Sequence, residues 1–421
     1  MLFLYIILTS LLYPLTFIIP FLSKKGKIFL DRRKLDRKKV SEISFQKSAS
    51  IPRVIWLHAA SVGELDQCKA QAKAIKESEP QTLVIQSVFS ESVQEKNFDS
   101  DYTYFNFHLP LDFYFAYNFI FEKFHPDSLV LMAWETWPNL ILAAKRYNCK
   151  VYLASAVLDP KSKRTSFMAR ALTRSVFKKI SGIAPVNESM ISAFQELSGE
   201  NTKVISCGDS RFDSVVDKIK SKTPNEKFTE FVKSYPHKKI LLLASTYSEC
   251  EKILFPKLRE ILDLGYSVWI FPHKIDKPRI DEINNHLHAE VLSYSLYSTV
   301  KNPCKDRIVL FDVLGILAFA YFHGSLAYIG GAVHNKVHNV LEPAYFGLPL
   351  MTGEKILNSF DAINLRENKS LTVINSSDDF FKAVQKYSDE KEREKANTAN
   401  KNYVLSRTGA SEKFYQSFLK K

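Results

Sequence analysis

Short apolar runs alternate with amphipathic stretches along most of this chain, and this alternation limits the folds that it can adopt. The runs have the length of buried strands, and the stretches between them repeat apolar residues at helical spacing. Parallel strands need such crossover connections, so the pattern predicts parallel sheets with helices on both faces, an α/β fold. The predicted helices include Leu65–Glu77 and Phe113–Phe124. The predicted strands are Arg53–His58, Thr82–Val88, Ser128–Ala133, Lys150–Ser155, Ile180–Ala184, Lys239–Ala244, Tyr266–Phe271, Arg307–Leu310 and Leu326–Ile329.

A polar segment with a proline, Ser221–Lys227, divides these elements into two sets. A chain of 421 residues is too long for one ordinary domain and suits two of average size. We therefore predict an N-terminal α/β domain over residues 51–215 and a C-terminal α/β domain over residues 216–421.

The amino-terminal stretch from Leu2 to Leu22 contains no charged residue. At ~1.5 Å per residue, one helix of this length crosses a ~30 Å hydrocarbon layer. We predict a membrane-anchor helix over residues 1–23 and a basic linker over residues 24–50. The linker would contact anionic lipids of the inner membrane and keep the domains in the cytoplasm. A cleaved signal peptide lacks support, because no basic residue precedes the apolar run. Pro14 and Pro20 leave a shallow anchor open.

The net charge of +13 indicates an acidic partner, which can be a membrane surface, nucleic acid or a phosphorylated substrate. A merely solvated basic surface is the alternative. The sequence has no RNA-binding signature, no zinc-finger spacing and no arginine-rich arm, so we expect no nucleic-acid partner. The five cysteines are irregularly spaced and odd in number, which favours free thiols in a reducing cytoplasm.

A nucleotide-binding turn is predicted near residue 330. The apolar run Leu326–Ile329 ends at Gly330 and Gly331, and a polar loop leads to a helix start at Val340–Ala344. Paired glycines let backbone amides approach a ligand, and amides at a helix start attract phosphate. Glu342 lies beside them and can accept hydrogen bonds from ribose hydroxyls.

A candidate catalytic carboxylate follows the first predicted strand. Glu64 stands at a helix start after Ser61 and Gly63, which would shape the turn. A positioned carboxylate can remove the proton of an attacking hydroxyl. The alternative is a helix-capping glutamate, because acidic residues are common in first turns.

Together, these two segments resemble the bacterial 3-deoxy-D-manno-octulosonic acid (Kdo) transferases that build the lipid A core. The family patterns H-A-x-S-V-G-E and G-G-H-N-x-L-E-P-A-x-x-G-x-P correspond to His58–Glu64 and to Val337–Ala344 followed by Gly347 and Pro349. The resemblance implies a GT-B fold, in which two Rossmann-like domains face a cleft. It also implies metal-independent, inverting transfer of Kdo from CMP-Kdo to a lipid A precursor (lipid IVA), without a cofactor and with Glu64 as general base.

Two further segments resemble family motifs in the first half. Ala133–Leu140 is similar to E-T-E-L-W-P-N-L, with Glu135 at the second glutamate and Ala133 in place of the first. Gly208–Asp213 resembles G-N-x-K-F-D, with a basic residue kept at Arg211. The acceptor-binding or supporting residues implied by the resemblance are Ser61, Gly63, Glu135 and Arg211.

The second half carries the implied donor site. Leu243–Glu251 resembles a strand followed by S-T-x-x-x-E-E, and His273-Lys274 replaces the Arg-His of P-R-H. Asp312–Leu317 resembles D-T-M-G-E-L, with Ile316 in place of glutamate. His334-Asn335 is an unmatched copy of His338-Asn339, and no Asp or Cys accompanies these residues as metal ligands, so we expect no metal. The implied donor-binding residues are Ser245, Thr246, Lys274, Gly330, Gly331, His338, Asn339 and Glu342.

Two alternatives remain. The departures at Lys274 and Ile316 allow a GT-B transferase that uses another nucleotide sugar, such as a UDP-sugar. The second alternative is a catalytically inactive membrane-bound scaffold, and the retained Glu64 and Glu342 argue against it.

Overall fold

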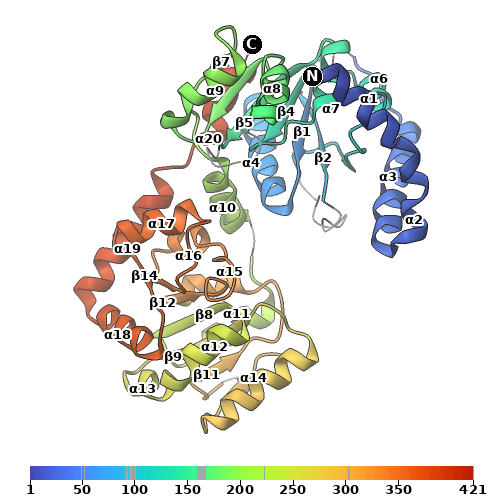
Figure 1. Cartoon of the computed structure of the whole chain (residues 1–421). Helices are drawn as coiled ribbons and strands as arrows, with labels where there is room; N and C mark the ends of the chain where they lie inside the picture. The colour runs from blue at the N-terminus through green and yellow to red at the C-terminus, as the bar shows by residue number, and fades with distance from the viewer. Residues whose placement is uncertain are drawn as a thin grey trace. The chain divides into compact units, whose positions relative to one another are not determined.

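The computed structural model divides the chain into two compact units (Figure 1). Unit 1 contains Met1–Ser214 and Arg407–Lys421, and unit 2 contains Val215–Ser406. The residues that the structure describes are 1–48, 50–51, 53–90, 93, 98, 101–158, 167–221, 223–301 and 304–420.

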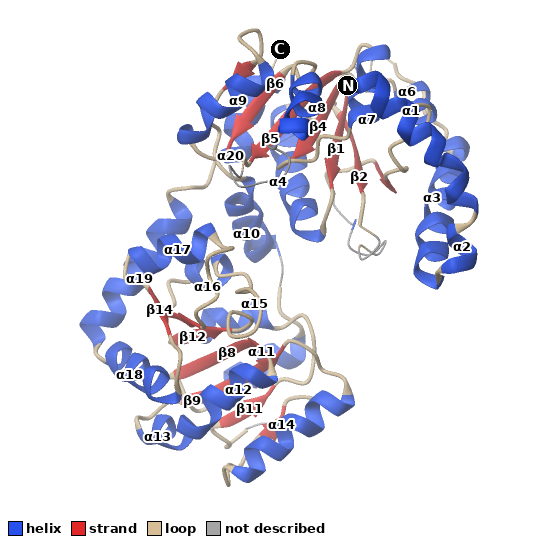
Figure 2. Cartoon of the chain, in the orientation of Figure 1, coloured by secondary structure: helices blue, strands red, loops and turns tan. Residues whose placement is uncertain are grey.

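Unit 1 is built on one parallel sheet with the strand order β3-β2-β1-β4-β5-β6-β7 (Figure 2). The five strands predicted for this half are all present. Two short edge strands, β3 and β7, were not predicted. The strands are β1 (Val54–Ala59), β2 (Leu83–Val88), β3 (Phe105–His108), β4 (Ser128–Met132), β5 (Lys150–Ala156), β6 (Gly182–Pro185) and β7 (Lys203–Val204). The helices are α4 (Val62–Ser78), α6 (Asn118–Phe124), α7 (Pro138–Arg146), α8 (Phe167–Phe177) and α9 (Ile191–Ser198), and α10 (Ser210–Ser221) leads into unit 2.

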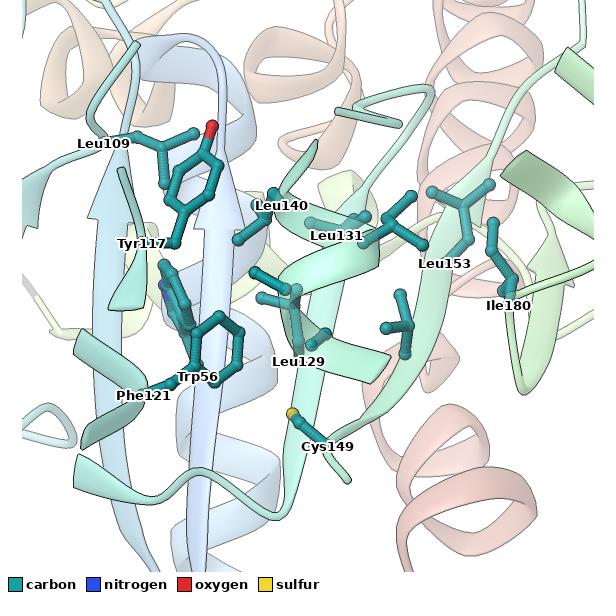
Figure 3. Close-up of a cluster of buried hydrophobic side chains, with 14 of the residues drawn as sticks. Trp56, Leu109, Tyr117, Phe121, Leu129, Leu131, Leu140, Cys149, Leu153 and Ile180 are labelled. Atoms are coloured by element: carbon teal, nitrogen blue, oxygen red, sulfur yellow. The ribbon is translucent and has the colours of Figure 1, made fainter. Parts of the chain in front are cut away.

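Both faces of this sheet are buried, as expected for parallel strands covered by helices. Successive side chains point to opposite faces, so Trp56 and Leu129 belong to one apolar cluster and Ile55 and Leu57 to another. The first cluster includes side chains of α6 and α7, and Figure 3 shows Trp56 and Phe121 within it. Their ring centroids are 5.4 Å apart.

The last residues of the chain complete the second cluster. Helix α20 (Ala410–Phe414) and the π-helical turn Tyr415–Leu419 bury Phe414, Tyr415 and Phe418 with residues of α4. The whole of residues 216–421 was predicted to form the second domain, whereas residues 407–421 pack in unit 1. An amphipathic pattern predicts a helix, but it does not reveal which core the helix will cover.

The apolar amino-terminal stretch is not one helix, which corrects the prediction for residues 1–23. It forms α1 (Leu2–Leu12), a 3₁₀ turn (Tyr13–Phe17) and α2 (Ile19–Leu22), and the basic α3 (Lys24–Glu42) follows. Pro14 and Pro20 each lie at the start of a new element, since proline removes a donor and suits the first turn of a helix. In the described ranges, no helix has both the length and the apolar character needed to cross a bilayer.

Unit 2 repeats the architecture with the strand order β10-β11-β9-β8-β12-β13-β14, again parallel. All four strands predicted here are present. The strands are β8 (Ile240–Thr246), β9 (Ser267–Pro272), β10 (Ser295–Leu296), β11 (Ile308–Leu310), β12 (Leu326–Ile329), β13 (Leu350–Thr352) and β14 (Leu371–Val373). The helices are α11 (Glu226–Ser234), α12 (Ser248–Leu254), α13 (Leu258–Asp263), α14 (Lys277–Ala289), α15 (Leu317–Ala320), α16 (Leu341–Tyr345), α17 (Phe360–Glu367), α18 (Ser377–Ser388) and α19 (Glu390–Leu405). All five cysteines are free thiols, as predicted, and all five are buried.

Candidate functional site

In each sheet, the predicted motifs flank the point at which the strand order reverses. In unit 1 the chain runs outward from β1 through β2 to β3 and then returns to β4 on the other side of β1. In unit 2 it runs outward from β8 through β9 and returns to β12. Ligands of open α/β sheets bind beyond the carboxyl ends of the strands at such a switch point. The segments after β1 and β4, and after β8 and β12, are therefore the candidate sites of the two units.

Glu64 lies in the first turn of α4, in the arrangement called a capping box. The Glu64 amide donates to Ser61 Oγ over 3.4 Å, and the Ala60 amide donates to Glu64 Oε2 over 2.5 Å. The capping role considered from the sequence is thus present in the structure. Burial raises the pKa of the Glu64 carboxyl, and the amides of Ala60 and Ser61 oppose this rise. A raised pKa makes the carboxylate a better proton acceptor near neutral pH.

Gly63 is not needed for packing. Its φ is not in the left-handed region, and an added Cβ would meet nothing within 4 Å among the described residues. The bare backbone at this turn, next to the exposed Ser61, instead leaves room for a ligand.

Glu135 and Arg211 also lie in unit 1. Glu135 is half-buried in the turn after β4, where its amide donates to Met132 O over 3.0 Å. Arg211 Nε donates to Asp209 Oδ2 over 2.7 Å, and the buried Asp209 accepts a second bond from Gln67 Nε2 over 3.0 Å. Because Gln67 belongs to α4, this network ties Arg211 to the helix that begins at the Glu64 turn.

The glycine pair of unit 2 permits a close approach of two backbone segments. An added Cβ at Gly330 would lie 2.0 Å from Ser245 O, and one at Gly331 would lie 2.2 Å from Lys336 O. Gly331 (φ +98°) and Ser245 (φ +54°) both adopt left-handed conformations. The end of β8 and the loop after β12 therefore contact each other directly, and the structure brings Ser245, Gly330 and Gly331 together.

A stack of aromatic side chains lies at the same edge of this sheet. The Tyr247 ring is 4.6 Å from that of His273, which is 4.7 Å from that of His338. His334 contacts Tyr247 at 4.3 Å, and the Tyr247 hydroxyl lies 3.0 Å from His338 Nε2. Burial is the main cause that lowers the pKa of His338 to about 4, and the neighbouring His273 is the second cause. Burial, followed by the neighbouring Lys274, also lowers the pKa of His273. His273 and His338 are therefore neutral imidazoles at neutral pH.

Sequence reasoning missed most of this stack. Tyr247 occupies an unspecified position of the S-T-x-x-x-E-E motif, His334 looked like an unmatched copy, and His273 looked like a departure from the family pattern. The one available signal was position, since the three residues follow β8, β12 and β9.

Two predicted donor residues have structural partners. The Thr246 side chain is fully buried, and its hydroxyl donates to Glu251 Oε1 over 2.8 Å. Asn339 Oδ1 accepts from the Leu341 amide over 2.9 Å at the start of α16. We therefore find Thr246 inside the fold, whereas Asn339 is exposed on the loop.

The remaining predicted donor residues are two charged groups of unit 2. Lys274 is exposed directly after β9. Glu342 is buried, and its Oε1 accepts from Lys218 Nζ over 2.6 Å. Lys218 was not foreseen, because α10 lies far from α16 in the sequence. Within the described part of the chain, no group of three His, Cys, Asp or Glu side chains is placed to hold a metal ion.

His58 is a buried residue of β1, and it makes stability depend on pH. Its Nδ1 lies 2.9 Å from Ser87 Oγ, and burial lowers its pKa from 6.5 to about 3. The unfolded chain binds this proton near pH 6.5 and the folded chain does not. We expect the free energy of unfolding to fall as pH drops from about 6.5 toward 3, by up to about 1.4 kcal/mol per pH unit. Urea unfolding between pH 7.5 and 4.5 measures this slope, which should become shallower in His58→Gln.

Comparisons with known proteins agree with this geometry. Residues 33–214 match the family model of 3-deoxy-D-manno-octulosonic-acid transferases (kdotransferases). A 3-deoxy-D-manno-octulosonic acid transferase of Haemophilus influenzae is 26% identical over 369 residues, which are 85% of this chain and 85% of that protein. A bifunctional glycosyltransferase/methyltransferase of Fusobacterium nucleatum is 24% identical over 385 residues, or 90% of this chain. The chain spans 58% of the length of that relative.

The solved structure of a UDP-GlcNAc 2-epimerase from Neisseria meningitidis, bound to UDP-GlcNAc, has a TM-score of 0.63 at 15% identity. It matches 88% of this chain and 100% of that one. At such low identity the likeness concerns the fold alone, which consists of two parallel-sheet α/β domains resembling those of GT-B glycosyltransferases.

Proposed function

We propose that this chain, which belongs to the 3-deoxy-D-manno-octulosonic acid (Kdo) transferase family, moves Kdo from CMP-Kdo to a glucosamine hydroxyl of a lipid A precursor, lipid IVA. The observation that carries this proposal is the placement of the motifs. Glu64 and Glu135 flank the switch point of unit 1, and Ser245 and Gly330 flank that of unit 2. One unit then binds the acceptor and the other binds the donor.

In the proposed reaction, the acceptor oxygen attacks the anomeric carbon of Kdo. The bond from that carbon to the phosphate oxygen of CMP breaks, and CMP leaves with the bonding electrons. Glu64 takes the proton of the attacking hydroxyl, a role that its raised pKa supports. Direct displacement from the opposite side inverts the anomeric centre.

The donor groups of unit 2 suit this leaving group. Lys274 can offset the charge of the departing phosphate, and the backbone around Gly331 can approach it closely. Glu342 would accept hydrogen bonds from the ribose, with Lys218 holding its carboxylate in place. These groups provide charge stabilisation without requiring a metal ion.

We also propose that the amino-terminal segment attaches unit 1 to the inner membrane surface. Helix α1 is held to the unit by polar contacts, since Tyr5 donates to Asp112 over 2.8 Å and Asn139 to Thr9 over 3.2 Å. Apolar side chains remain exposed beyond it, with Phe21 at 89% and Leu22 at 80%. Exposed apolar groups followed by a basic helix suit shallow binding to anionic lipids. Flotation with anionic vesicles, but not with neutral ones, is the expected result.

The decisive assay uses the purified protein with CMP-Kdo and lipid IVA. We expect release of CMP and a product whose mass has grown by Kdo. Free CMP should compete with the donor, and UDP should not. Competition by UDP alone would favour another nucleotide sugar, and a lack of turnover with every donor would favour an inactive scaffold.

A further inference from the structure

A pocket of about 460 Å³ opens in unit 1 beside the Glu64 turn. Its lining comes from the first turns of α3 and from the loops that follow β1 and β2. Its volume lies within the range of about 300–1,000 Å³ that is typical of small-molecule sites. The lining residues are Lys25, Gly26, Phe29, Ala60, Phe89 and Ser90.

The aromatic side of the pocket is held in place. The rings of Phe29 and Phe89 meet edge to face at 5.6 Å, and the Arg33 guanidinium lies 3.3 Å from the Phe29 ring centre. Arg33 donates to Leu109 O over 2.7 Å and to Phe89 O over 2.6 Å. Trp137 packs on Phe89 at 4.6 Å. Such fixed ring faces, which carry partial negative charge, suit the C–H groups of a sugar ring.

The polar side of the pocket adjoins the proposed base. Ala60 lines the pocket, and its amide donates to the Glu64 carboxylate. Lys25 is exposed at the pocket and is flanked by Lys24 and Lys27 on the same helix. A cationic side chain beside aromatic rings matches a ligand that combines a phosphate with a sugar.

From this arrangement we infer that the pocket holds the phosphorylated sugar headgroup of the acceptor. Lys25 pairs with its phosphate, Phe29 and Phe89 pack on its sugar ring, and its reactive hydroxyl faces Glu64. The inference rests on the proposed function, because it takes Glu64 as the base. In this assignment α3 is part of the acceptor site, whereas residues 24–50 were predicted to form a linker.

The test compares Lys25→Ala with Lys38→Ala, a matched loss of charge on the same helix. Lys38 is 71% exposed and pairs with Glu42. We expect Lys25→Ala to raise KM for the acceptor about tenfold, the value of one charged hydrogen bond, with KM for CMP-Kdo unchanged. Lys25→Arg should reverse most of this rise in the acceptor KM. Phe29→Leu, like Lys25→Ala, should raise the acceptor KM. Lys38→Ala should match the wild type, which separates this effect from general attraction to lipid.

A second arm uses a dephosphorylated acceptor. The wild type and Lys25→Ala should then have the same KM, since the phosphate that distinguishes them is gone. Unchanged acceptor KM values in Lys25→Ala and Phe29→Leu, with an active wild type, would overturn the pocket assignment alone. An inactive wild type would instead overturn the proposed function. Calorimetry with the deacylated, phosphorylated headgroup would then test the pocket assignment separately, and an absence of binding would contradict that assignment.

Discussion

Glu64→Gln is expected to lower kcat for Kdo transfer by about 10²–10⁴-fold while leaving KM for both substrates nearly unchanged. The amide cannot accept the proton that leaves the attacking hydroxyl. It can still accept the hydrogen bond of the Ala60 amide, and glutamine also serves in a capping box. The substitution therefore separates the two roles of this residue, proton acceptor and helix cap. Single-turnover kinetics with CMP-Kdo measure the first role, and thermal unfolding measures the second.

Glu77→Gln is the matched control for this experiment. Glu77 lies on the same helix with a side chain that is 61% exposed, and its ion pair with Lys73 is long at 3.9 Å. Exposed pairs of this kind contribute little to stability, so both kcat and the melting temperature should remain those of the wild type. If Glu64→Gln keeps normal turnover, the base assignment fails. If it loses turnover together with several degrees of melting temperature, the cap rather than the base accounts for the loss.

The fold class followed from the sequence because strand–helix alternation is a local pattern. Long buried strands such as Val54–Ala59 and Ile240–Thr246 are visible as apolar runs. Most strands of two or three residues, such as β13 (Leu350–Thr352), contain too few residues to show a period, although β11 (Ile308–Leu310) was predicted from its apolar run. Their pairing is set by the neighbouring strand, which local sequence does not identify.

The candidate sites could be predicted only in part, for a related reason. Glu64, Gly330 and Gly331 belong to continuous motifs, so the sequence itself identifies them. Arg211 donates to the nearby Asp209, which in turn accepts from Gln67 of α4, 142 positions away. Glu342 acquires Lys218 across 124 positions. The Tyr247 stack joins three loops. Such groups form only when the sheet aligns the carboxyl ends of its strands, and a single sequence carries no record of that alignment.

Gly330→Ala should lower the free energy of unfolding of unit 2 by about 3 kcal/mol or more and abolish CMP binding. The new Cβ would lie 2.0 Å from Ser245 O and 2.7 Å from Ser245 C, and both atoms belong to the backbone. Neither atom can rotate away as a side chain can, because the β8 and β12 strands are paired in register up to Ala244 and Ile329. Relief of the clash must separate the end of β8 from the loop after β12, and these two segments form the proposed donor site.

Gly63→Ala is the glycine control, because it distinguishes a packing requirement from the general effect of adding a methyl group. The described residues leave a Cβ at Gly63 without a contact inside 4 Å, and alanine favours helical positions, so stability should hold or rise by up to about 1 kcal/mol. Chemical denaturation and CMP titration of the two variants make the comparison. Wild-type stability and CMP affinity in Gly330→Ala would mean that the loops can part without cost, and the glycine pair would then have no role in shaping the donor pocket. A loss of stability with normal CMP affinity would place the nucleotide elsewhere in unit 2.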